Sequence, residues 1–208
     1  MAGRIGTDEA GKGDFFGYLT VAGAYVDEKT AAELVAAGVR DSKTLSDNRV
    51  MSLEKLVKER CKHDVVRISP EKYNKLYLKV GNLNKLLGWA HARVIENLLQ
   101  KVDCKTVISD QFGDKEFLEG RLMEKGRTIN LIQKPHAEED VAVAAASILA
   151  RAEFLRSLER LSTQIGFRLP KGATNVIETA RKISEKYGIE FLSKVAKTHF
   201  KTMEKIRL

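Results

Sequence analysis

Residues 6–13 read GTDEAGKG and place two adjacent carboxylates, Asp8 and Glu9, directly before a Gly-Lys-Gly turn. The residues that lead into them, 4–8, are predicted to form a short strand that ends on the acids. Side chains alternate along a strand, so both acids can face one site only if the chain turns there, and Gly11 and Gly13 permit such a turn. Paired acids beside a basic, flexible turn indicate metal-assisted chemistry on a polyanion.

Strand and helix patterns alternate along most of the chain. Four further strands are predicted, at residues 15–26, 63–69, 106–110 and 128–132. Helices are predicted at residues 30–39, 46–61, 82–99 and 141–161, with two or three more after residue 172. This order predicts an α/β fold with one central sheet, whose strand order cannot be read from the sequence.

The positive charge of the chain is concentrated near its C-terminus. The 208 residues carry a formal charge of +8, from 36 Lys and Arg against 28 Asp and Glu. From residue 168 onward, ten Lys and Arg stand against four Glu, so +6 of the excess lies there. We therefore predict an α/β body at residues 1–165 and a basic helical extension at residues 166–208, packed on the same domain. Such a segment suits nucleic acid or an anionic surface, and a solvated helical face is the alternative.

Cysteine usage and hydropathy exclude several classes of protein. Cys61 and Cys104 lie far apart with no CxxC spacing, which gives no support to a zinc site or a disulfide framework. The N-terminus has no stretch typical of a signal peptide, and no apolar run approaches the ~18 residues of a membrane span. We expect a soluble, cytoplasmic protein.

A third acid, Asp110, ends the strand predicted at residues 106–110. Carboxylate oxygens at strand ends suit Mg²⁺ or Mn²⁺, and such clusters commonly hold two ions about 3.5–4 Å apart. A fourth acid is expected before the alanine-rich helix, where Glu138, Glu139 and Asp140 are the candidates. Each of these three could instead complement the dipole of that helix.

One nucleotide-binding motif is excluded. Gly6-x4-Gly11-Lys12 matches the start of a P-loop, but Gly13 stands where the Mg²⁺-binding Ser or Thr should follow. Asp8 and Glu9 would also lie inside a loop that must cradle phosphate, where they would repel it.

Seven motifs together resemble a known family. They are DEAGKGDFFG (8–17), RDSKTLS (40–46), NLNKLL (82–87), SDQF (109–112), AVAAASILAR (142–151), LPKGA (169–173) and KTHF (197–200). In this order they resemble bacterial ribonuclease HIII, in the type 2 ribonuclease H group that also contains ribonuclease HII. GKG at 11–13, and LPKGA where the sister family has a tyrosine-bearing segment, favour HIII over HII.

The resemblance implies a ribonuclease H-like fold with a mixed five-stranded sheet flanked by helices. It also implies an endoribonuclease that cleaves the RNA strand of RNA–DNA hybrids with two divalent ions, leaving 5′-phosphate and 3′-hydroxyl ends. Asp8, Glu9 and Asp110 look like metal-binding catalytic acids. Glu138 is chosen as the fourth catalytic acid across a one-residue deletion relative to the family, while Glu139 and Asp140 stay open.

The resemblance also assigns the residues that meet the substrate. Gly11, Lys12 and Gly13 look like the turn that enters the minor groove, where backbone donors can read a ribose 2′-hydroxyl. Further contacts to the nucleic-acid backbone are expected from Lys43, Lys171 and Ser147. Solvation is the alternative for the two lysines and helix packing for Ser147, and the role of His136 is open.

Ribonuclease HIII carries an additional N-terminal substrate-binding domain, but here the catalytic motif begins at residue 8. Either that domain is naturally absent or it has been removed, and we expect the body and the basic C-terminal helices to grip the hybrid, in a chain that acts as a monomer. Two other functions are weighed: HII-like cleavage at single embedded ribonucleotides, and a non-catalytic hybrid-binding module. The carboxylates of Asp8, Glu9 and Asp110 argue against the non-catalytic binding module, because they would repel phosphates unless a metal ion neutralises them.

Overall fold

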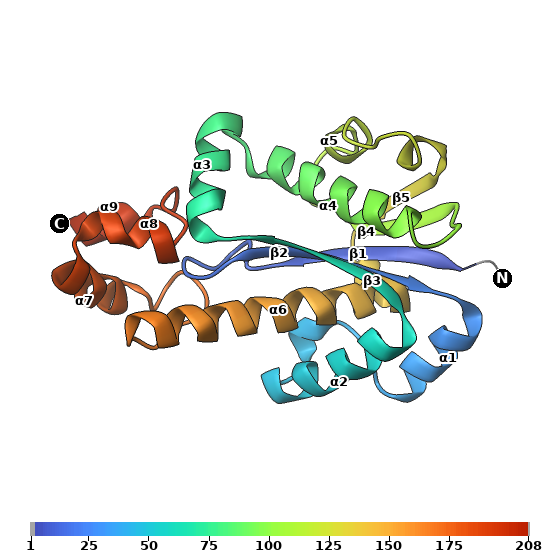
Figure 1. The fold of residues 1–208 in the computed structure, drawn as a ribbon, viewed down its shortest axis with the longest axis horizontal. Helices are drawn as coiled ribbons and strands as arrows, with labels where there is room; N and C mark the ends of the chain where they lie inside the picture. Colours follow the sequence, from blue (N-terminus) through green and yellow to red (C-terminus); the bar gives the residue numbers. More distant parts are fainter. Residues whose placement is uncertain (1–2, 208) are drawn as a thin grey trace. The chain divides into compact units, whose positions relative to one another are not determined.

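The central feature of the chain is a five-stranded sheet of order β3-β2-β1-β4-β5 (Figure 1). The structure, a computed structural model, describes residues 3–207 and the side chains of residues 3–206, so the outer limits 1 and 208 of the predicted domains lie outside it. The strands are β1 (Arg4–Ala10), β2 (Leu19–Val26), β3 (Lys62–Ile68), β4 (Thr106–Asp110) and β5 (Asn130–Lys134). The predicted α/β fold with a mixed five-stranded sheet is confirmed.

Three of the strands run parallel. β1 pairs with β4 so that Thr7 lies opposite Ser109, and β4 pairs with β5 so that Asp110 lies opposite Lys134. Parallel neighbours cannot be joined by a tight turn, so long helical crossovers connect them. The carboxyl ends of β1 and β4, which carry the predicted acids, therefore lie at the same edge of the sheet.

The helices include those predicted at residues 30–39, 46–61, 82–99 and 141–161, with ends that differ by up to four residues. They are α1 (Glu28–Ala36), α2 (Asp47–Arg60), α3 (Pro70–Val80), α4 (Leu83–Leu99), α5 (Glu116–Glu119), α6 (Val141–Ile165), α7 (Ile177–Tyr187), α8 (Leu192–Val195) and α9 (Thr202–Arg207). Short 3₁₀ turns are η1 (Ser42–Thr44), η2 (Gly126–Thr128), η3 (Ala137–Glu139) and η4 (Ile189–Phe191). The predicted N-cap of α2 is confirmed, because the Ser46 hydroxyl accepts a 3.3 Å hydrogen bond from the backbone N–H of Arg49.

Two predicted strand boundaries need correction, and one helix was missed. The strand predicted at residues 15–26 begins only at Leu19, because Gly17 adopts φ +85° and breaks the extended backbone before it. The fifth strand was expected at residues 128–132 and lies at 130–134, since η2 occupies its predicted start. Helix α3 was not predicted, although Ser69 caps it and Gly81 ends it at φ +64°.

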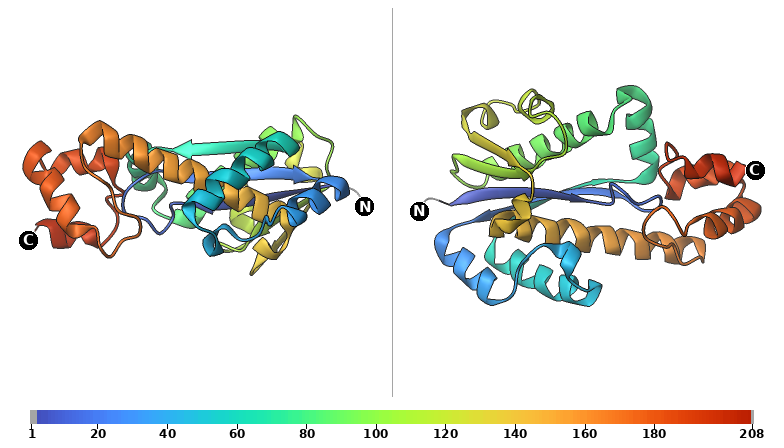
Figure 2. Two further views of the ribbon diagram at one scale, coloured as in Figure 1. Left: turned by 90° about the horizontal axis from the view of Figure 1, so that it is seen from below. Right: turned by 180° about the vertical axis from the view of Figure 1, so that it is seen from behind.

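The chain divides into two compact units, which we call the acid unit (residues 1–9, 21–66 and 82–152) and the turn unit (residues 10–20, 67–81 and 153–208). In the acid unit, α4 and α5 cover one face of the sheet and α1, α2 and the first half of α6 cover the other (Figures 1 and 2). Helix α6 packs so closely on β1 that a side chain at Gly6 would collide with the backbone of Ala142. The boundary predicted between residues 165 and 166 stays a prediction.

The turn unit has its own hydrophobic core. Phe15 and Phe16 lie in it with Phe154 of α6, and residues of α7, α8 and α9 complete it. Within the described residues, no helix of either unit is long and apolar enough to cross a membrane.

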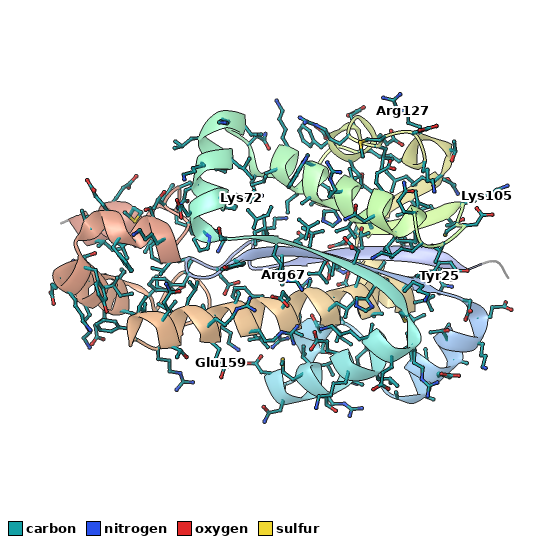
Figure 3. The ribbon with its side chains drawn as sticks, viewed as in Figure 1. Tyr25, Arg67, Lys72, Lys105, Arg127 and Glu159 are labelled. Atoms are coloured by element: carbon teal, nitrogen blue, oxygen red, sulfur yellow. The ribbon has the colours of Figure 1, made fainter. Side chains whose placement is uncertain are left out.

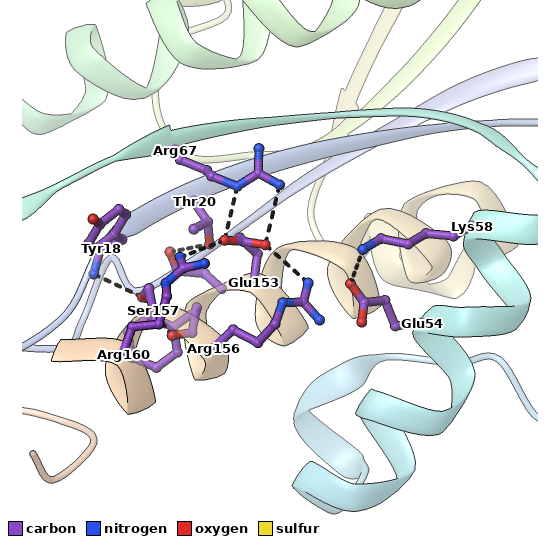
Figure 4. Close-up of polar contacts among 11 residues, drawn as sticks. Tyr18, Thr20, Glu54, Lys58, Arg67, Glu153, Arg156, Ser157 and Arg160 are labelled. Carbon is purple, nitrogen blue, oxygen red and sulfur yellow. Dashed lines mark hydrogen bonds and ion pairs between the residues drawn. The ribbon is translucent and has the colours of Figure 1, made fainter. Parts of the chain in front are cut away.

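A buried carboxylate, Glu153 of α6, is held by three arginines in the turn unit (Figure 4). Its oxygens lie 2.9 Å from Arg67 Nε, 3.1 Å from Arg156 Nη2 and 3.0 Å from Arg160 Nη2. Burial alone would raise the pKa of Glu153, but the hydrogen bonds from the arginines outweigh it and lower the pKa to about 2. Arg67 is on β3, so this cluster joins that strand to α6 (Figure 3).

Candidate active site

Asp8 and Asp110 lie level with each other on adjacent strands of the acid unit. The register pairs Thr7 with Ser109, and each acid is the next residue along its strand. Asp8 is only 7% exposed, and its Oδ1 accepts a 2.8 Å hydrogen bond from the backbone N–H of Glu9. Burial raises the pKa of the Asp8 carboxyl well above its usual range, and the carboxylate of Glu9 and, less strongly, that of Asp110 raise it further. The hydrogen bond from the backbone N–H of Glu9 and the charge of Lys43 oppose this rise without cancelling it. Added positive charge would therefore stabilise the ionised form.

Lys43 is the cation that faces these acids. Partial burial lowers the pKa of its ammonium, but the carboxylates of Asp8, Asp41, Glu138 and Asp110 outweigh burial and raise the pKa. The charges of the acids predicted on β1, β4 and η3 therefore all act on Lys43, whose side chain is exposed to solvent.

The loop that carries Lys43 is anchored to α6 by two side chains. The Ser147 hydroxyl accepts a 3.1 Å hydrogen bond from the backbone N–H of Ser42 and donates to the carbonyl of Ala144 at 2.9 Å. Arg151 donates to the carbonyl of Ser42 and pairs with Asp47 at 2.7 Å. Ser147 is 2% exposed, so what the structure shows for it is the fixing of this loop; its predicted contact with substrate stays a prediction.

The three candidates for the fourth acid have different surroundings. Asp140 pairs with Arg4 at 2.7 Å and accepts a 2.8 Å hydrogen bond from the backbone N–H of Ala142, in the first turn of α6. Glu139 is exposed. Glu138 is half-buried on η3 and is the one of the three whose charge acts on Lys43. This arrangement favours Glu138.

His136, whose role the sequence left open, precedes η3. Its backbone is left-handed, with φ 55°, and its Nδ1 lies 3.8 Å from Glu138 Oε1. The exposed imidazole therefore stands beside the favoured acid.

Glu9 is held by a buried histidine. His91 of α4 is fully buried; its Nε2 lies 3.2 Å from Glu9 Oε2, and its Nδ1 lies 2.9 Å from the hydroxyl of Thr7. Both ring nitrogens of His91 thus have a polar partner. The ring also stacks on Phe112, with centroids 4.7 Å apart, so its orientation is fixed from two sides.

The donor set fits a hard divalent ion, because all four predicted acids offer carboxylate oxygens. Among the described residues, however, no three His, Cys, Asp or Glu side chains lie close enough together to hold a metal ion. Two of the acids are engaged elsewhere: Glu9 contacts His91, and Asp110 accepts from the backbone N–H of Ala137 at 3.4 Å.

The predicted substrate-reading turn lies in the turn unit. Gly11 has φ +84°, and a side chain there would collide with the carbonyl of Tyr18, so only glycine fits. Gly13 is exposed, with open space where a side chain would stand, and Lys12 is half-buried. The backbone at Gly13 is therefore open to a ligand.

The LPKGA segment, which includes the predicted contact Lys171, joins this turn. The backbone N–H of Phe15 donates to the carbonyl of Gly172 at 2.8 Å, and the N–H of Gly172 donates to Asp14 Oδ1 at 2.6 Å. Lys171 is exposed beside these bonds. The structure thus brings together two predicted substrate-binding segments that are about 160 residues apart in sequence.

Comparison with known proteins gives the family. The family model described as ribonuclease HII matches residues 5–203. The chain belongs to the ribonuclease HII family. Ribonuclease HIII of Protochlamydia amoebophila (strain UWE25) is 47% identical over 204 residues, which cover 98% of this chain and 68% of that protein.

Solved structures of the ribonuclease HII family agree with this assignment. The crystal structure of Bst-RNase HIII in complex with Mn²⁺ superposes with a TM-score of 0.91 at 35% identity, covering 99% of this chain and 69% of that one. The ribonuclease HII of Archaeoglobus fulgidus, solved in complex with PCNA, gives a TM-score of 0.82 at 28% identity, covering 99% and 97%. The resemblance to ribonuclease HIII predicted from seven motifs is confirmed.

Sequence reasoning about this ribonuclease HII-family chain missed His91 and Arg151. His91 lies on the buried face of α4, and the apolar residues of that face predict packing alone. Its partner Glu9 is 82 residues away in sequence. Arg151 ends the AVAAASILAR motif, but nothing local indicates that it binds the carbonyl of Ser42. A buried histidine within an otherwise apolar helix face was the one signal available for the first of them.

Proposed function

We propose that the protein is an endoribonuclease that cleaves the RNA strand of RNA–DNA hybrids by metal-assisted hydrolysis, leaving 5′-phosphate and 3′-hydroxyl ends. The observation that carries the proposal is the level placement of Asp8 and Asp110 on adjacent strands, in a chain of the ribonuclease HII family. The charges of both acids and of Glu138 act on Lys43, which supports their assignment to one site. Membership of the family supports the reaction class, and the placement of the acids supports the choice of residues.

Each of the predicted site residues has a proposed role. Asp8, Glu9 and Asp110 would hold Mg²⁺ or Mn²⁺, with Glu138 as the fourth acid, and His91 would keep Glu9 oriented. When bound, such ions supply positive charge that activates water and stabilises the departing oxygen. Lys43 balances the acids and offers an ammonium to a phosphate, while Gly11, Lys12 and Gly13 present backbone donors to the 2′-hydroxyl that marks RNA. Ser147 acts by fixing the Lys43 loop, and Lys171 adds charge beside the turn.

Cleavage of a labelled continuous hybrid tests the proposal. The unmodified chain should cut the RNA strand of the hybrid with Mg²⁺ or Mn²⁺, leave the matching DNA duplex intact, and stop when EDTA is added. Asp110→Asn should reduce kcat by at least about a hundredfold and keep hybrid binding. Asp114→Asn, an exposed acid of the same unit, is the matched control and should retain activity. Equal cleavage by Asp110→Asn and the unmodified chain would overturn the assignment.

HII-like cleavage at a single embedded ribonucleotide is the second candidate. It is favoured by the match to the ribonuclease HII model over residues 5–203 and by the similarity to the Archaeoglobus fulgidus structure over 97% of that chain. A duplex with one ribonucleotide and a continuous hybrid, compared at equal concentration, separate the two activities. Faster cleavage of the first would reverse our choice.

We further propose that the protein acts as a cytoplasmic monomer and binds hybrid partly through its basic C-terminal segment. The ten Lys and Arg from residue 168 onward support the binding of hybrid by this segment. Binding should then weaken steeply with salt, because phosphate contacts release counterions. Sedimentation at working concentration tests the oligomeric state, and a flat salt response between low and physiological ionic strength would contradict the role of the segment.

A further inference from the structure

Lys197, of the KTHF motif, is a fully buried lysine in the turn unit. Its Nζ donates to the carbonyl of Gly17 at 2.8 Å and to that of Phe16 at 3.4 Å. Its backbone N–H donates to the carbonyl of Phe15 at 2.8 Å. One residue therefore satisfies three consecutive carbonyls at the end of the DEAGKGDFFG motif.

Burial of this ammonium is unfavourable in itself. It lowers the pKa of Lys197 to about 7, with Asp14 the charge that opposes the shift. A buried amino group is retained where it satisfies polar groups that would otherwise lose their hydrogen bonds, and the carbonyls of Phe16 and Gly17 are such groups. The hydrogen bonds to these carbonyls, rather than an ion pair, are thus what Lys197 supplies.

The segment around Lys197 is itself rigidly placed. Asn74 of α3 accepts a 2.9 Å hydrogen bond from the backbone N–H of Thr198 and donates to the carbonyls of Ser193 at 3.1 Å and Ala196 at 2.9 Å. The ring of Tyr73 lies 5.9 Å from Lys197 Nζ. Lys197 therefore acts from a fixed support.

The residues that Lys197 holds form one end of the turn at 11–17. Directly before them, Asp14 and Phe15 are tied to Gly172. Lys12 and Gly13 precede these attachments, and the backbone N–H of Asp14 closes the turn over them by donating to the carbonyl of Gly11 at 3.4 Å; Gly13 has no neighbour at the place of a side chain. The shape of this exposed stretch therefore depends on residues 14–17 being held.

We propose that Lys197 is a positioning residue that holds the turn at 11–17 in the form that binds the backbone of the hybrid. The inference rests on the proposed function, because it assumes that this turn meets RNA–DNA hybrid. Lys197 touches no substrate in this view, and it acts through the carbonyls of Phe16 and Gly17. Its loss should raise KM and leave kcat nearly unchanged.

The test compares Lys197→Met with Lys197→Arg, which keeps a donor, and with Lys75→Met. Lys75 is an exposed lysine of α3 paired with Glu71, so its loss removes the same charge from the same unit. Amide hydrogen exchange at residues 11–17 of the free protein should be about tenfold faster in Lys197→Met, as loss of a buried hydrogen bond predicts, and unchanged in Lys75→Met. KM for hybrid should rise about tenfold in Lys197→Met with kcat within about twofold, and Lys197→Arg should restore most of the loss.

Several results would overturn the proposal. They are unchanged exchange at 11–17, exchange that rises equally throughout the turn unit, a fall in kcat alone, failure of Lys197→Met to fold, or equal losses in the Met and Arg variants. Hydrogen exchange needs no substrate, whereas the proposed function is judged by cleavage with the unmodified chain. Absence of cleavage there, with faster exchange at 11–17 in Lys197→Met, would refute the function and leave the structural role standing.

Discussion

Glu153→Gln removes the carboxylate that pairs with Arg67, Arg156 and Arg160 (Figure 4). A pKa lowered from 4.5 to about 2 corresponds to about 3 kcal/mol of folding free energy for a fully shielded site. The arginine side chains are 27% to 57% exposed, so solvent screening reduces this, and we take about 1–2 kcal/mol. The variant should lose that amount at pH 7.

The stabilisation that Glu153 contributes should decrease as the pH falls. Because the pKa of Glu153 is lowered by folding, its contribution is complete above the unfolded value of 4.5 and is lost as pH falls toward about 2. Urea unfolding followed by circular dichroism at low salt should therefore show a difference between the unmodified chain and Glu153→Gln that falls to about half between pH 7 and pH 3.

Glu159→Gln is the matched control, since Glu159 is exposed on the same helix (Figure 3). It should change the free energy of unfolding by less than about 0.5 kcal/mol. Equal stability of Glu153→Gln and the unmodified chain at pH 7, or a difference that is the same at both pH values, would refute the reasoning.

Three further predictions concern the two predicted sites. Glu138→Gln should lower kcat on hybrid by at least about a hundredfold while Glu139→Gln stays within about threefold; the reverse order would move the fourth acid to the exposed neighbour. His91→Leu should weaken Mn²⁺ binding, measured by calorimetry, by about 10-fold or more, because Glu9 loses the group that orients it; unchanged affinity would leave His91 a packing residue. Gly11→Ala should lower the free energy of unfolding by about 1–3 kcal/mol, since the backbone is left-handed and the space is filled, and Gly13→Ala should not; equal urea midpoints would contradict this.

The parts of the fold that local sequence determines were predictable. Strand 106–110 and the cap at Ser46 depend on neighbouring residues alone, and both are confirmed. The start of β2 was misplaced because residues 15–18 are apolar for another reason: Phe15 and Phe16 belong to the core of the turn unit and not to the sheet. Apolar character alone does not distinguish these two kinds of burial.

The parts that depend on distant contacts were not predictable from residue patterns. Lys43 was expected to meet phosphate, but the charges of Asp8, Asp110 and Glu138 act on it because of strand register and the anchoring of its loop by Ser147. Motif resemblance supplied the identity of the acids, and only the structure distinguishes Glu138 from its neighbours by their contacts. Lys197 was quoted within a motif without a role, because its hydrogen-bond partners lie 180 residues earlier.

The segments that carry the acids differ in how well they tolerate insertions and deletions. A deletion of one residue within β1 or β4 would turn every following side chain to the opposite face, so Asp8 and Asp110 tolerate no insertion or deletion in their strands. Glu138 stands on η3, a single turn between β5 and α6 with no ladder to preserve. A change of length in this connection therefore leaves the strand register of Asp8 and Asp110 intact. It would act instead on the position of Glu138 and on the hydrogen bond from the backbone N–H of Ala137 to Asp110.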